Sequence, residues 1–191
     1  MKKYNYFGIY DDYNETLKRF ITEYEIEIPI YFRHLGKSIR FNFDQYSAAK
    51  THALSCEILT YIFQNKNFFY CCYGEIGIPQ KRLKQYIKGR PNKPHCIEYH
   101  SLLNREDFEY EFDNISFVEV SPNTFNFNKF TKLISYGRGL DSNEYFISLK
   151  EKIVVHFYDS RGMDIVSLDN DDLIESLKKR FEQYPYWSPK I

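Results

Sequence analysis

Apolar and polar residues repeat along this chain with two periods, and the period changes from one segment to the next. In residues 38–43 (SIRFNF) every second side chain is apolar, which is typical of a half-buried strand. In residues 46–64 the stripe running from Ala48 to Phe63 repeats at helical spacing. Residues 67–73 (NFFYCCY) are apolar on both faces, as in a central strand covered on each side. The chain therefore mixes helices with strands.

The same patterns predict the remaining elements. Further helices are expected over residues 11–24, over 80–88, from an N-cap at Asn126 to Gly137, and from 170 to 181. Further strands are expected over residues 95–103, 108–120, 144–149, 153–158 and 163–168. Tight turns join the last three strands, which must therefore run antiparallel. The predicted class is α+β: a mixed or mostly antiparallel sheet with a C-terminal three-stranded meander and helices packed on it.

Length and charge narrow the class of protein. A chain of 191 residues can bury one sizeable core, so residues 1–191 are expected to form a single domain. Lys plus Arg and Asp plus Glu both number 26, and this balance argues against a nucleic-acid binder or a polybasic membrane-surface protein. No run of eighteen apolar residues and no export signal occurs, so a cytoplasmic protein without membrane contact is expected.

The aromatic content is high, with 18 Tyr, 17 Phe and one Trp. Aromatic side chains favour strands and carry large buried areas, and tyrosine also suits protein-binding surfaces. Two interpretations stay open: a biased composition, or an aromatic-rich binding face.

The cysteines and histidines do not suggest a metal centre. The four cysteines are Cys56, Cys71, Cys72 and Cys96, and none has C-x-x-C spacing. His95 and His100 lie five residues apart on one predicted strand and so face opposite ways. His52, on the long helix, is interpreted as a partly buried, hydrogen-bonded side chain. We expect no metal and no cofactor.

The densest polar chemistry lies in HFYDSRGMD, residues 156–164. A catalytic interpretation uses His156, Asp159, Arg161 and Asp164, with the aspartates as a carboxylate pair or the arginine as an anion clamp. The structural interpretation is simpler: Asp159 accepts backbone N–H bonds within the turn, and Arg161 bridges a carboxylate across the hairpin.

One basic cluster surrounds the predicted helix over residues 80–88. It comprises Lys81, Arg82, Lys84, Lys88 and Arg90, with Tyr86 interleaved. Such a cluster is either a solvated helix face or a contact surface for an acidic partner or nucleic acid.

The strand-turn-strand HFYDSRGMDIVSL resembles the most characteristic stretch of the bacterial domain family DUF3885, a domain of unknown function. The segments SIRFNF, HALSCEILTYIF and FNFNKFTKLIS are similar to the family in the same order, so the resemblance spans roughly residues 29–187. The chain departs from the usual family pattern at Ser160, where a second aspartate is common. The family has no assigned activity, so the resemblance implies a fold and no catalytic residues.

These observations favour a non-enzymatic bacterial protein-binding domain, of the immunity or antitoxin type, that neutralises a toxin partner. The alternative is an enzyme acting on a nucleotide or nucleic acid through His156, Asp159, Arg161 and Asp164. The expected binding residues are those of the basic cluster, the expected partner is another protein, and the oligomeric state stays open.

Overall fold

The computed structural model describes residues 37–73, 80–89, 95–98, 114–136, 144–148, 150–151, 153–167 and 171–187. The helix predicted over residues 11–24 lies outside these ranges. Side chains at a few positions within them, such as Asp159, are also outside the description.

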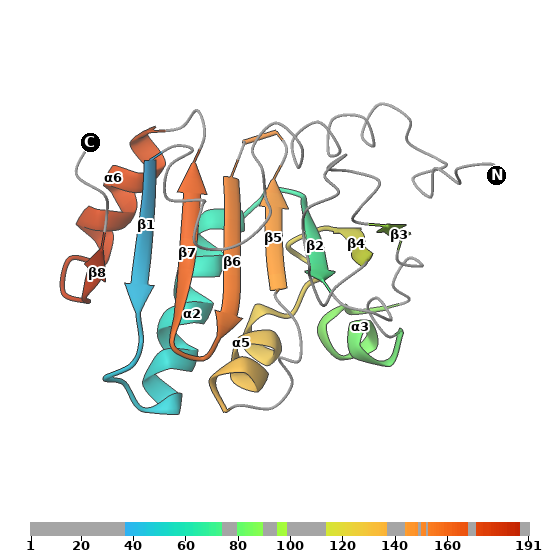
Figure 1. The fold of residues 1–191 in the computed structure, drawn as a ribbon, viewed down its shortest axis with the longest axis horizontal. Coiled ribbons are helices and arrows are strands. Elements are labelled where there is room, and N and C mark those ends of the chain that lie inside the picture. The colour runs from blue at the N-terminus through green and yellow to red at the C-terminus, as the bar shows by residue number, and fades with distance from the viewer. Residues whose placement is uncertain are drawn as a thin grey trace, which may run out of the picture.

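The described strands form one sheet in which every pairing is antiparallel. Their order across the sheet is β3-β4-β2-β5-β6-β7-β1-β8, which can be followed in Figure 1. The strands are β1 (Lys37–Asn42), β2 (Phe68–Tyr73), β3 (His95–Glu98), β4 (Asn114–Val120), β5 (Glu144–Ser148), β6 (Ile153–Asp159), β7 (Gly162–Ser167) and β8 (Tyr186–Trp187). The predicted strands are confirmed, although β3 and β4 cover only parts of the ranges expected for them.

The predicted C-terminal meander is the run β5-β6-β7. Asp159 pairs with Gly162 across the last turn, and the register shifts between Phe157 and Asp159, where β6 carries an irregularity. Beyond the meander, β1 pairs with β7 along its whole length, from Lys37 opposite Ser167 to Asn42 opposite Gly162. The early strand β1 therefore lies between two late ones, β7 and β8.

Four described helices accompany the sheet: α2 (Ala48–Phe63), α3 (Gln80–Tyr86), α5 (Phe127–Ser135) and α6 (Asp171–Arg180). Asn126 is the N-cap of α5, as predicted, and its side chain accepts a hydrogen bond from the backbone N–H of Lys129 at 3.0 Å. Ser47 caps α2 with a longer bond of 3.4 Å. Gly89, just after α3, has a φ of +85°, which glycine adopts readily.

The helices pack on one face of the sheet because their apolar stripes meet the apolar positions of alternate strand residues. Leu54, Ile58 and Ile62 of α2 join the same core as Phe146 of β5. The centre of that core is aromatic: the Phe146 ring lies within 6.1 Å, centroid to centroid, of its aromatic neighbours. These neighbours are Phe63, Phe68, Tyr70, Phe125, Phe127, Phe130 and Phe157. The high aromatic content thus forms the interior, and the fold class is α+β as predicted.

Side chains on the opposite face of the sheet form a polar row across four strands. Tyr145 stands opposite His156, His156 opposite Asp164, and Asp164 opposite Arg40. Directly opposed residues of an antiparallel pair project to the same face, so these four side chains are neighbours. The row is buried as far as Asp164, which is 5% exposed.

Candidate functional site

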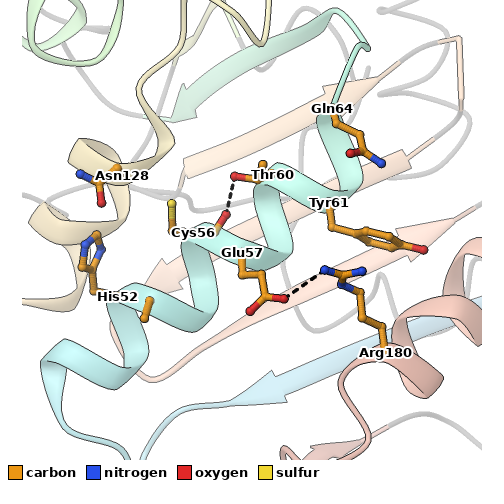
Figure 2. Close-up of a pocket in the computed structure, with 9 residues that line it drawn as sticks. His52, Cys56, Glu57, Thr60, Tyr61, Gln64, Asn128 and Arg180 are labelled. Atoms are coloured by element: carbon orange, nitrogen blue, oxygen red, sulfur yellow. Dashed lines mark hydrogen bonds and ion pairs between the residues drawn. The ribbon is translucent and has the colours of Figure 1, made fainter.

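An open groove of about 510 Å³ runs along the outer face of α2. We call it the α2 groove. Helices α5 and α6 flank it on either side (Figure 2). The side chains that give it chemical character are His52, Cys56, Glu57, Tyr61, Asn128 and Arg180.

The sequence of α2 explains why this groove is shallow and mixed in character. The helix buries its larger apolar residues, such as Ile58 and Phe63, against the sheet. Its outer face carries small side chains, including Ala53 and Thr60, beside longer polar ones. Because a helix turns every 3.6 residues, the small residues line up as a trough between the two neighbouring helices.

The wall toward α6 is an ion pair stacked on a ring. The Arg180 Nη2 donates to the Glu57 Oε1 at 3.3 Å, and the Arg180 guanidinium carbon lies 4.8 Å from the Tyr61 ring centroid. Figure 2 shows the guanidinium between the Glu57 carboxylate and the Tyr61 ring. Both charged side chains are about half exposed, so the pair alone contributes little stability. It does hold Arg180 and Tyr61 in a fixed arrangement at the surface.

The wall toward α5 holds His52 in a defined orientation. The His52 Nδ1 lies 2.9 Å from the Thr131 Oγ1, and that hydroxyl donates its one proton to the Phe127 carbonyl at 2.8 Å. The Nδ1 must therefore carry the hydrogen and donate to Thr131, which leaves Nε2 of the neutral ring as an acceptor. His52 is half-buried and hydrogen-bonded, as the sequence predicted.

The four residues proposed for catalysis do not surround the α2 groove. His156 and Asp164 are brought together in the polar row, on the opposite face of the sheet from α2. Arg161 is exposed in the turn between β6 and β7, and its carbonyl accepts from the Phe43 N–H at 2.6 Å. Asp159 lies at the end of β6.

Asp164 pairs with Arg40 rather than with Arg161. The Arg40 Nε donates to the Asp164 Oδ1 at 2.5 Å, and the Arg40 Nη2 donates to the Oδ2, which makes the pair bidentate. The sequence interpretation missed Arg40 because it is 124 residues away along the chain. One signal was available: Arg40 is a polar position of the alternating strand SIRFNF, on the face away from the helices.

His156 is uncharged in the folded protein at neutral pH. Burial, followed by the positive charge of Arg40, lowers the pKa of His156 to about 3. Its ring stacks on Tyr145 with a centroid distance of 4.3 Å. At 1% exposure, the imidazole is not accessible to a substrate in this conformation.

The basic cluster is only partly visible. Lys84 and Lys88 are exposed on and after α3, whereas the side chains of Lys81, Arg82 and Arg90 lie outside the description. Tyr86 does not share this surface. It is 3% exposed and packs against aromatic core residues, with Phe130 at 5.3 Å between ring centroids. Its position on the buried stripe of α3, next to Leu83, explains this placement.

Within the described residues, no group of three or more His, Cys, Asp or Glu side chains could hold a metal ion. Cys56 and Cys71 form no disulfide. In the same part of the chain, no helix is long and apolar enough to cross a membrane.

The fold and the groove define an α+β protein whose single antiparallel sheet is covered by helices on one face. The family DUF3885, a domain of unknown function, matches residues 13–187, and the chain belongs to this family. The match confirms the resemblance seen in the strand-turn-strand and extends it toward the N-terminus. No curated protein and no solved structure matches the chain.

Proposed function

We propose that this chain is a non-enzymatic, cytoplasmic protein-binding domain that contacts its partner through the α2 groove. The observation that carries the proposal is the Tyr61–Arg180 wall: a tyrosine and an arginine, ordered against each other at the surface of an open groove. Tyrosine and arginine are enriched among the residues that dominate binding energy at protein interfaces.

The shape of the groove suits a helical segment of the partner. Its floor carries the small residues Ala53, Cys56 and Thr60 at helical spacing, which lets another helix approach closely. The flanking helices α5 and α6 set the direction of approach, and their exposed Lys129, Lys132 and Lys179 favour acidic residues along the edges of the partner helix. We propose a toxin encoded beside this protein as the partner, which makes the chain an immunity or antitoxin protein.

The test is binding of the purified chain to the product of the adjacent gene, measured by calorimetry, together with protection of cells that express that product. We expect Tyr61→Ala and Arg180→Glu each to weaken binding by at least about tenfold. Tyr136→Ala and Lys84→Glu are matched controls at exposed positions away from the groove, and they should bind as the parent does.

A charge exchange separates a partner contact from a purely internal one. The double variant Glu57→Arg with Arg180→Glu keeps an ion pair between α2 and α6 but reverses its direction. Recovery of the melting temperature without recovery of binding supports direct contact with the partner. Full binding by both single variants, or no binding and no protection by the parent chain, contradicts the proposal.

The alternative is an enzyme acting on a nucleotide or nucleic acid, and the closeness of His156 to Asp164 is the observation in its favour. It requires the sheet face to open, because both side chains are buried. It predicts hydrolysis by the purified chain that His156→Gln abolishes without changing the melting temperature. A parent chain without turnover on nucleotides or on single-stranded and double-stranded nucleic acid ends this alternative.

A further inference from the structure

A second cavity, of about 340 Å³, lies at one end of the sheet and is separate from the α2 groove. We call it the strand-end cavity. Three parts of the chain build it: the loop between α2 and β2, the end of β4, and the turn that joins β5 to β6. Its volume is in the range of cavities that hold small molecules.

The charged side chains around the strand-end cavity are balanced in sign. Lys66 and Lys150 supply two cations, and Glu119 and Glu151 supply two anions. The Lys66 Nζ lies 3.8 Å from the Glu151 Oε2, which is longer than the roughly 2.7–2.9 Å of a close charged hydrogen bond. Both side chains therefore keep hydrogen-bonding capacity that a ligand can use.

Ser148 adds a neutral donor to the same cavity. It lines the cavity at the end of β5, and the residue is only 1% exposed. Its hydroxyl finds no hydrogen-bond partner among the described residues. Buried hydroxyls in folded proteins are usually paired, so this group is suited to a bound polar atom.

One wall of the cavity is apolar, because Phe69 of β2 lines it next to the charged residues. A ligand of one charge sign would satisfy one pair of ionic groups and bring the other pair close to a repelling neighbour. A ligand that carries both signs and a hydrocarbon part satisfies all of the walls together.

We propose that the strand-end cavity binds a small zwitterion of the α-amino acid class. Its carboxylate lies toward Lys66 and Lys150, with the Ser148 hydroxyl as a further donor, and its ammonium lies toward Glu119 and Glu151. Its side chain packs on Phe69. This assignment does not depend on the α2 groove or on its partner.

The test is calorimetric titration of the full chain with L-leucine and with L-glutamine. Two analogues of leucine serve as ligand controls: 3-methylbutylamine, which lacks the carboxylate, and 4-methylpentanoate, which lacks the ammonium. We expect at least one of the amino acids to bind, and each singly charged analogue of leucine to bind at least about tenfold more weakly than leucine. Equal binding of leucine and 4-methylpentanoate, or no binding of either amino acid, overturns the proposal.

Variants place the ligand within the protein. Lys150→Gln and Glu119→Gln change residues that are at least partly exposed, and each should weaken amino-acid binding by about tenfold or more. Ser148→Ala removes the buried hydroxyl while sparing the charges and should also weaken it. Lys132→Gln is the matched control on α5, and it should bind as the parent does. Unchanged binding in all three cavity variants places the ligand elsewhere and overturns the assignment.

Discussion

At the scale of single residues, the polar row is the feature with the most at stake. Arg40 and Asp164 form a bidentate pair in which the carboxylate is almost wholly buried. Removing one member of such a pair leaves the other without compensation, whereas replacing both with apolar residues avoids that cost.

The first prediction concerns this pair. We expect Asp164→Asn to lower the free energy of unfolding by about 2 kcal/mol, less than for a fully buried pair because Arg40 is partly exposed. Urea denaturation at neutral pH measures the change. The double variant Arg40→Met with Asp164→Leu should recover most of the loss, and a loss below about 0.5 kcal/mol in Asp164→Asn contradicts the account.

The second prediction concerns pH. The pKa of His156 is about 3 in the folded protein, compared with 6.5 for an ordinary histidine. Between these two values the unfolded chain holds a proton at this residue and the folded chain does not. The His156 contribution to stability is therefore complete above pH 6.5 and falls by about 1.4 kcal/mol for each pH unit below it.

Urea denaturation of the parent and of His156→Gln at pH 7 and pH 5 isolates this effect. The variant should lose less stability than the parent over that interval. His52→Gln is the matched control, since it removes one histidine from the half-buried site beside Thr131, and it should keep the pH dependence of the parent. Equal slopes in the parent and in His156→Gln contradict a neutral, buried His156.

At the scale of elements, the helix ends depend on local chemistry. The α5 N-cap and the α2 N-cap offer a comparison within one protein, because the Asn126 bond is 3.0 Å long and the Ser47 bond 3.4 Å. Such local features were predictable, since a cap involves residues only three apart in the sequence.

The third prediction follows from that comparison. Asn126→Ala should lower the free energy of unfolding by about 1 kcal/mol, because a backbone N–H at the start of α5 loses its acceptor. Ser47→Ala should cost less, because its longer bond is weaker. Thermal or urea denaturation of the two variants decides, and a larger loss at Ser47 contradicts the reading of these caps.

At the scale of the whole molecule, the aromatic residues determine how the layers hold together. The described phenylalanines gather around Phe146, while Tyr136 and Tyr186 are the exposed large hydrophobic residues among those described. The interpretation of a biased composition and that of an aromatic binding face thus give way to a third: most described aromatics form the core.

The fourth prediction tests that core. Phe146→Ala should lower the free energy of unfolding by about 3–5 kcal/mol, because it removes a fully buried ring and leaves a cavity among seven aromatic neighbours. Tyr136→Ala, at 50% exposure, should stay within about 0.5 kcal/mol of the parent. Equal effects of the two changes contradict a core centred on Phe146.

The sequence predicted the elements better than their arrangement. The strand at SIRFNF and the cap at Asn126 depend on neighbouring residues, and both are confirmed. The position of β1 between β7 and β8, and the Arg40–Asp164 pair that results, depend on residues more than a hundred positions apart. The α2 groove was missed for the same reason, since Glu57 meets Arg180 only after the chain has folded.

The place of β1 in the sheet also has a consequence during synthesis. Ribosomes add roughly 5–20 residues each second, so β1 leaves the ribosome on the order of ten seconds before β7, the strand that pairs with its whole length. For that interval the hydrogen-bonding edge of β1 has neither of its final neighbours. Pairing so distant in sequence also makes folding slow. The nascent chain must therefore keep this edge from other chains until the meander arrives, and a chaperone that holds extended segments suits that need.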